Sequence, residues 1–184
     1  YQERTGSGAF QIDRIRGTMI VTYILTAALV LASLIVQGHS SFEILRIAGC
    51  KPDIIFIVIV YMAYNFGSFY GETTGFIAGL FHDAISNSPL GLLAFPKMML
   101  GYVVGFFGRS VFRQNILTIA LLIFLSSLLK GVVTLFLGYL FHTASVSSII
   151  NVIFPEAFYN ALLAPPLFFL FDRLFEKELA REGY

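Results

Sequence analysis

Residues 18–37 read TMIVTYILTAALVLASLIVQ, a run of twenty residues without a charged side chain. At 1.5 Å per residue, a helix of this length spans about 30 Å, the thickness of the hydrocarbon core of a bilayer. A signal peptide is the competing interpretation, but its apolar region is usually only about 7–15 residues long. The run therefore predicts an uncleaved transmembrane helix.

The composition of the whole chain also indicates a membrane protein. Of the 184 residues, 57% are hydrophobic and 12% are charged, whereas soluble domains carry about 25% charged residues. The 12 Lys and Arg against 11 Asp and Glu give a net charge of +1, which provides no positive field for nucleic acid. The single cysteine, Cys50, excludes an intrachain disulfide. We therefore predict an all-α polytopic membrane protein.

Five further apolar segments follow the first one. We expect a sharp turn near Gly71, because a single helix over 54–86 would be about 50 Å long. The alternative is a five-span protein in which 54–86 is one interrupted element. The preferred prediction is one domain of six transmembrane helices over 18–171, preceded by a cytoplasmic arm, 1–17, and followed by a cytoplasmic helical extension, 172–184. The further expected helices are 54–70, 73–86, 91–108, 116–141 and 148–171.

The distribution of Lys and Arg predicts the orientation. With the N-terminus inside, eight of the 12 fall in cytoplasmic segments and two, Arg46 and Lys51, fall outside, while Lys97 and Lys130 lie within helices. This asymmetry predicts that both termini are cytoplasmic. The eight cytoplasmic residues are Arg4, Arg14, Arg16, Arg109, Arg113, Arg173, Lys177 and Arg181.

Four charged residues fall at membrane depth: Asp83, Lys97, Lys130 and Glu156. A charge at mid-membrane costs roughly 2.5–3.5 kcal/mol on insertion scales, so each one is expected to have a partner. Asp83 lies seven residues before Leu90 and Lys97 lies seven residues after it, so an antiparallel hairpin centred there places both at one depth. We therefore expect Asp83 and Lys97 to approach each other, directly or through water, as a structural ion pair. A functional polar site and separate partners are the alternatives.

Small residues four positions apart favour close approach of helix backbones. Four glycines lie on the same helix faces as Asp83 and Lys97. They are Gly75 and Gly79 before Asp83, and Gly101 and Gly105 after Lys97. On the first helix, Ala28 and Ala32 form a similar face. Packing within the chain is its default interpretation, and docking of a partner helix is the alternative.

The last two helices form a second predicted hairpin, which turns near Ser145. Lys130 lies fifteen residues before this turn and Glu156 lies eleven after it, so their depths differ by about 6 Å. A lysine side chain can span much of that distance, so we predict a Lys130–Glu156 pair with a structural role. Pro155 and Pro165-Pro166 are expected to kink or locally open the last helix.

Motifs for catalysis and cofactor binding are absent from the sequence. It contains no HExxH, no GxSxG and no phosphate-binding glycine loop, and its three histidines are far apart. We therefore predict no catalytic, cofactor-binding or metal-binding residues.

A larger pattern covers residues 52–105, about a third of the chain. It resembles the rod-shape-determining protein MreD family of bacteria, most specifically in a GLxxD step, an SPLG turn and a GYxxG step. The residues that carry the resemblance are Pro52-Asp53, Gly67, Gly71, Gly75-Phe76, Gly79-Leu80, Asp83, Pro89-Leu90-Gly91, Gly101-Tyr102 and Gly105.

The resemblance implies a non-enzymatic component of the cell-elongation machinery in the bacterial cytoplasmic membrane. The partners that it implies are the single-span protein MreC and, through MreC, the actin-like MreB and the RodA–class B penicillin-binding-protein synthase. It also implies a fold similar to the substrate-binding subunits of energy-coupling-factor vitamin transporters, which have six helices and dock their partner through an AxxxA face on the first helix. Ala28 and Ala32 match that face.

Two other functions remain open at this stage. A vitamin-binding transporter subunit would need a closed pocket near the outer face of the membrane, and an ion-coupled carrier would use Asp83 or Glu156. The sequence offers only a few candidate binding residues for such a pocket, namely His39, Glu43, Arg46 and Asn87.

Overall fold

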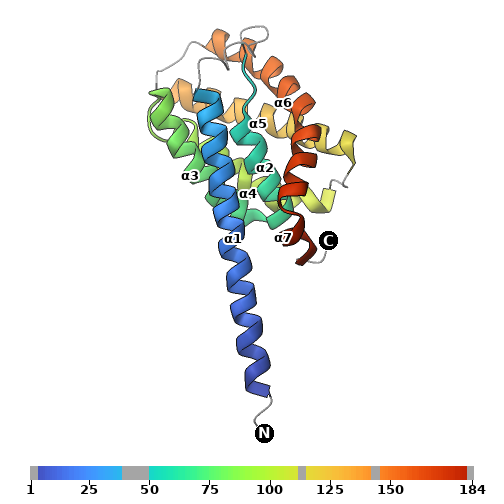
Figure 1. Ribbon diagram of the computed structural model, residues 1–184. Helices are drawn as coiled ribbons and strands as arrows, with labels where there is room; N and C mark the ends of the chain where they lie inside the picture. Colours follow the sequence, from blue (N-terminus) through green and yellow to red (C-terminus); the bar gives the residue numbers. More distant parts are fainter. Residues whose placement is uncertain (1–3, 39–49, 112–114, 142–145, 182–184) are drawn as a thin grey trace.

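The computed structural model describes residues 4–38, 50–111, 115–141 and 146–181 (Figure 1). Within these ranges the chain forms only α-helices, which confirms the predicted all-α class. The expected loop residues His39, Glu43, Arg46, Arg113 and Ser145 and the chain ends 1–3 and 182–184 lie outside the described residues. The helices are α1 (Arg4–Gly38), α2 (Ile54–Phe66), α3 (Ser68–Ser86), α4 (Ala94–Val111), α5 (Ile116–Leu140), α6 (Val146–Leu174) and α7 (Glu176–Arg181).

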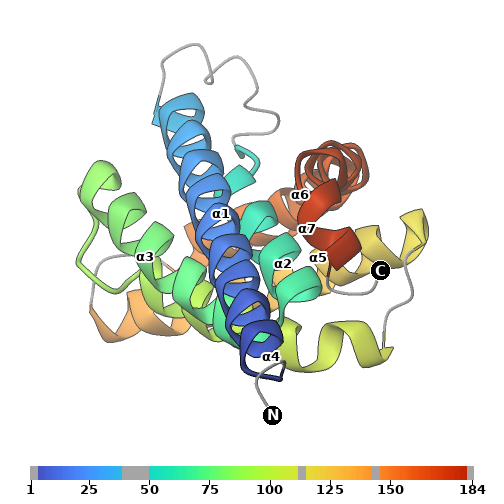
Figure 2. The ribbon, with the colours of Figure 1, turned by 60° about the horizontal axis from the view of Figure 1, so that its bottom comes forward.

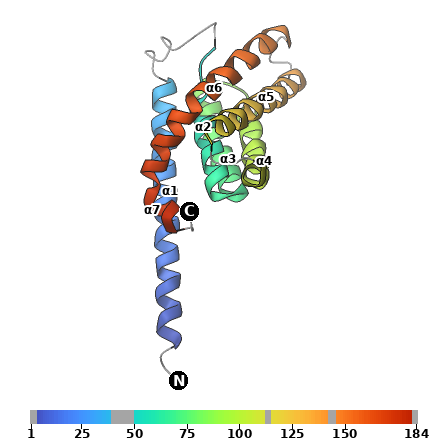
Figure 3. The same cartoon turned by 90° about the vertical axis from the view of Figure 1, so that its right-hand side faces the viewer.

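Three of the described helices contain a segment long and apolar enough to cross a membrane. These segments are Ile20–Gly38 of α1, Ile116–Leu140 of α5 and Asn151–Leu174 of α6. The helix α2 and the segment Ala94–Gly108 of α4 are apolar but shorter. The N-terminal part of α1 extends away from the other helices, and α7 lies toward the same end of the helical body (Figures 1 and 3).

The helix α2 is the core of the fold. Residues 55–63 have no accessible surface, and α2 packs against α1, α3, α4 and α6. Figure 2 shows α2 with α3 on one side and α6 on the other. A helix that is apolar on all sides is typical of an enclosed position. Because lipid tails are as apolar as these side chains, close van der Waals contact with the neighbouring helices stabilises α2 in a membrane.

A single glycine separates α2 from α3. Gly67 has φ +92° and ψ 179°, a backbone conformation that glycine adopts without steric strain. The predicted division of 54–86 into two helices is therefore present. The turn lies at Gly67, four residues before its expected position near Gly71. Gly71 lies in the first turn of α3 and faces α4.

The helices α3 and α4 form an antiparallel hairpin with a glycine interface. A Cβ atom added to Gly71 would lie 2.5 Å from the carbonyl oxygen of Gly101, and one added to Gly75 would lie 2.5 Å from the carbonyl oxygen of Lys97. The two backbones therefore approach at a distance that only glycine permits. The predicted small-residue faces of these helices are used for packing within the chain. Two further contacts of the same kind are Gly79 with Ala94 and Gly105 with Ser68.

The helices α5 and α6 form the second hairpin (Figure 3). The prolines were expected to kink or locally open the last helix. The helix shows no break at them, since α6 continues through all three. The helical extension is interrupted at the buried Phe175, after which the chain resumes as α7. The ring of Tyr61 lies 5.8 Å from that of Phe175 and 5.1 Å from that of Phe168. These aromatic contacts join the end of α6 to the core helix α2.

Candidate functional site

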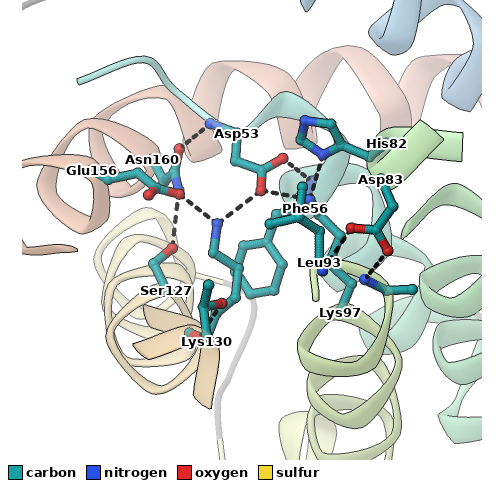
Figure 4. Close-up of polar contacts among 12 residues, drawn as sticks. Asp53, Phe56, His82, Asp83, Leu93, Lys97, Ser127, Lys130, Glu156 and Asn160 are labelled. Carbon is teal, nitrogen blue, oxygen red and sulfur yellow. Dashed lines mark hydrogen bonds and ion pairs between the residues drawn. The ribbon is translucent and has the colours of Figure 1, made fainter. Parts of the chain in front are cut away.

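Asp53 caps the start of α2 and is the centre of a buried polar cluster (Figure 4). Its Oδ1 accepts a hydrogen bond from the main-chain N–H of Phe56 at 3.0 Å. Its own main-chain N–H donates to Oδ1 of Asn160 on α6 at 2.8 Å. With the oxygen of its side-chain amide oriented toward α2, Gln37 on α1 accepts from the first two N–H groups of α2 at 2.9 and 2.8 Å. The start of α2 is thus joined to α1 and α6.

Two lysines from different helices share the Asp53 carboxylate. Nζ of Lys97 on α4 lies 3.0 Å from Oδ2 of Asp53, and Nζ of Lys130 on α5 lies 2.8 Å from the same oxygen. The side chain of Lys97 is only 1% exposed. Both lysines were predicted to need a partner inside the membrane, and Asp53 is the partner that they have in common.

Lys130 also forms the predicted ion pair with Glu156 on α6. Its ammonium group lies 4.9 Å from the centre of the Phe56 ring, within the range of a cation–π interaction. A neutral contact strengthens the same junction of α5 and α6, because Asn160 Nδ2 donates to Oγ of Ser127 at 3.2 Å.

His82 on α3 completes the cluster on the side of Lys97. Its Nδ1 lies 2.6 Å from Nζ of Lys97. Because a lysine ammonium group has only donors, Nδ1 accepts this hydrogen bond, and the proton of the neutral imidazole is on Nε2. Lys97 therefore binds two acceptors from two helices, Asp53 Oδ2 and His82 Nδ1.

The formal charges of the cluster cancel. Asp53 and Glu156 are balanced by Lys97 and Lys130, and the four residues come from the start of α2 and from α4, α5 and α6. Removing one member of a buried ion pair leaves an uncompensated charge and typically costs about 3–5 kcal/mol. The cluster therefore helps to fix how α2, α4, α5 and α6 pack against one another.

Asp83 has a different role from the predicted one: it binds the start of α4. Its carboxylate accepts hydrogen bonds from the main-chain N–H groups of Gly91, Leu93 and Ala94 at 2.9, 2.9 and 3.2 Å. It also accepts from the hydroxyl group of Ser88 at 2.9 Å. Gly91 has φ +98°, so glycine suits this position of the turn. The buried Asp83 thus satisfies N–H groups in the turn and at the start of α4.

The predicted ion pair between Asp83 and Lys97 is therefore wrong. Lys97 pairs with Asp53, and Asp83 accepts hydrogen bonds from main-chain N–H groups and a serine hydroxyl group. The reason is the register of the hairpin. The backbone of Lys97 packs against Gly75, and Asp83 lies eight residues further along α3, about 12 Å away. Asp83 is level with the turn, where main-chain donors bind it, and the side chain of Lys97 reaches Asp53 and His82 instead.

A cavity of about 390 Å³ adjoins the cluster. Asp53, Lys97, Lys130 and Glu156 all line it, together with His82. Within the described part of the chain, no group of three or more His, Cys, Asp or Glu residues has a geometry that could hold a metal ion. The other lining residues are Gln37, Cys50, Lys51, Pro52, Ser86, Leu93 and Val152.

The other predicted site residues are distributed over three places. Ala28 and Ala32 lie on the exposed face of α1. Pro89, Leu90 and Gly91 form the turn between α3 and α4, while the half-exposed Tyr102 stacks on Phe106 with ring centres 6.3 Å apart. Asp53 was not predicted as the ion-pair partner because it precedes its helix and lies outside the apolar segments. An aspartate directly before an apolar helix is nevertheless typical of an N-cap residue.

The fold and the cluster define an all-helical membrane protein whose helices are joined by a neutral network of buried charges. A family model described as rod shape-determining protein MreD matches residues 14–178. The chain therefore belongs to the MreD family of bacterial membrane proteins, which acts in rod-shape determination. No curated protein and no solved structure gives a significant match.

Proposed function

We propose that this chain is a non-enzymatic scaffold of the rod-shape complex in the bacterial cytoplasmic membrane. In this proposal α1 to α6 all lie in the bilayer with both termini in the cytoplasm, and the chain holds the transmembrane helix of MreC in position. Through MreC it contributes to positioning MreB and the RodA–class B penicillin-binding-protein synthase. Membership of the family and the positive-inside distribution of Lys and Arg support the proposal.

The observation that carries the docking proposal is the exposed face of α1. Ala28 and Ala32 are exposed there, between Ile24 and Ile35, which are 62% and 70% exposed. The glycine faces of α3 and α4, in contrast, are fully used by their mutual contact. A small-residue face that does not pack within the chain is available to a partner helix, which would gain the close backbone contact that stabilises helix pairs in lipid.

An apolar groove next to this face enlarges the proposed docking surface. It has a volume of about 370 Å³ and lies between α1 and α3. Leu31 on α1 and Phe81 on α3 line it and are about half exposed. The large side chains of a partner helix could fill this groove while its small residues approach Ala28 and Ala32. The charge cluster would keep the platform rigid, because it joins α2 and α4 to α5 and α6.

The test is co-purification of full-length MreC with the intact chain from membranes in a mild detergent. Enlarging the face with Ala28→Leu and Ala32→Leu should abolish recovery of MreC and cause loss of rod shape, while the chain still accumulates in the membrane. Val132→Phe on α5 is the control, because Val132 is also exposed and apolar but lies on another helix. Unchanged MreC recovery in the double variant would overturn the proposed docking face. Recovery of an ATPase module without MreC would overturn the scaffold function itself.

A further inference from the structure

A second cavity, of about 200 Å³, lies where three helix ends meet. It is formed by the end of α2, the start of α5 and the end of α6, and it shares no lining residue with the cavity at Asp53. Its walls combine apolar side chains with two strongly polar residues, Asn65 and Asp172. The other lining residues are Tyr64, Ile116, Ile119, Pro165, Phe168 and Phe169.

Asn65, which lines this cavity, carries a buried hydrogen-bond donor without an acceptor. The residue is 2% exposed, and its Nδ2 is the one buried side-chain nitrogen or oxygen atom without a partner in the part of the chain that the structure describes. Buried polar atoms in proteins are nearly always bonded to protein, water or a ligand. The Asn65 amide therefore has a free donor beside the cavity that an acceptor from outside the chain could satisfy.

The start of α5 adds further donors next to Asn65. Asn115 precedes α5 with an extended backbone, and its side chain makes no capping hydrogen bond to the first turn. The first N–H groups of a helix have no acceptor within the helix, and the helix dipole favours an anion there. Ile116, the first residue of α5, lines the cavity. A negatively charged oxygen group thus fits between Asn65 and the start of α5.

Asp172 gives the same cavity a preference for a cation. Its Oδ1 accepts a hydrogen bond from the hydroxyl group of Tyr61 at 3.0 Å. It is the one formally charged residue among the described residues that line the cavity. It also lies in the last turn of α6, where the helix dipole favours a cation. The cavity therefore has one position that favours an anion and another that favours a cation.

We propose that this cavity binds the headgroup of an aminophospholipid. The phosphate oxygens would accept from Asn65 and from the first N–H groups of α5, and the primary ammonium group would donate to Asp172. A lipid is the favoured source of these groups because Ile116 and Phe169, at the edge of the cavity, are 71% and 73% exposed and offer an apolar path for acyl chains. On the proposed topology the site faces the cytoplasmic leaflet. The inference goes beyond the scaffold function and does not depend on MreC.

The test is lipid retention by the intact chain. The protein is incorporated into vesicles of equal parts phosphatidylethanolamine and phosphatidylglycerol, extracted in a mild detergent and examined by native mass spectrometry. We expect retained phosphatidylethanolamine to exceed phosphatidylglycerol by about tenfold, the factor that one hydrogen bond to a charged group typically provides. Equal retention of the two lipids, or retention of neither, would overturn the proposal.

Three variants locate the site. Asp172→Asn keeps an acceptor for Tyr61 but removes the charge, so the preference for phosphatidylethanolamine should disappear. Asn65→Leu removes the orphan donor and should lower retention even if Asp172→Asn does not accumulate. Glu176→Gln removes an exposed charge nearby and should leave retention unchanged. A preference that survives both of the first two variants would show that the lipid binds elsewhere.

Discussion

Lys97 and Lys130 lie on different helices and bind the same oxygen atom, Oδ2 of Asp53, at 3.0 and 2.8 Å. Two ammonium groups repel each other, so this arrangement needs the carboxylate between them and the second carboxylate, Glu156, on Lys130. The junction of α2, α4, α5 and α6 therefore depends on both carboxylates.

Asp53→Asn should destabilise the chain strongly. Asparagine is also a good helix cap and can keep the hydrogen bond from Phe56, so the substitution isolates the charge. It leaves Lys97 and Lys130 with only one carboxylate, and we expect the free energy of unfolding to fall by about 3–5 kcal/mol. Unfolding by titration with sodium dodecyl sulfate measures this change. A loss of less than about 1 kcal/mol would contradict the shared role of Asp53.

Lys130 and Glu156 should be energetically coupled. Lys130→Met alone leaves the partly buried Glu156 without its cation, whereas adding Glu156→Gln removes that charge as well. We therefore expect the double variant to be more stable than the sum of the single changes implies, by about 0.5–3 kcal/mol. A double-mutant cycle measures this coupling. The comparison cycle of Asp83→Asn with Lys97→Met should give a smaller coupling, because each of those residues has other partners.

Asp83→Ala should loosen the start of α4. The substitution removes the acceptor of three main-chain N–H groups and of the Ser88 hydroxyl. A lost helix cap costs about 0.5–2 kcal/mol, and buried unsatisfied donors increase that cost. Hydrogen–deuterium exchange should therefore become faster at Gly91, Leu93 and Ala94. Unchanged exchange there would show that another group can replace the carboxylate.

Gly75→Ala should disrupt the α3–α4 hairpin. The added Cβ would lie 2.5 Å from the carbonyl oxygen of Lys97, so the two backbones must separate. Overpacking of this kind costs about 1–3 kcal/mol, and it would also displace Lys97 from Asp53. Gly38→Ala is the matched control, because nothing lies within 4 Å of a Cβ atom at Gly38. Thermal unfolding in detergent should separate the two variants, and equal melting temperatures would argue against a glycine interface.

Several features follow from the sequence because they depend on local properties. The uncharged run at 18–37 predicts the apolar segment Ile20–Gly38 of α1. The depths of Lys130 and Glu156 in a simple hairpin predict their ion pair. The spacing of Gly75 and Gly79 predicts close helix contact, because residues four apart lie on one face of a helix.

Other features required the tertiary structure. The Asp83–Lys97 pair failed because the prediction centred the hairpin on Leu90, whereas the packed pairs Gly71–Gly101 and Gly75–Lys97 are centred on residue 86. The role of Asp53 depends on α4 and α5, which lie far from it in the chain. Charge and periodicity therefore determine that this chain has apolar helices whose buried charges need partners. Only three-dimensional packing decides which partners they receive, because a long lysine side chain can reach several helices and binds the carboxylate that the fold places nearest.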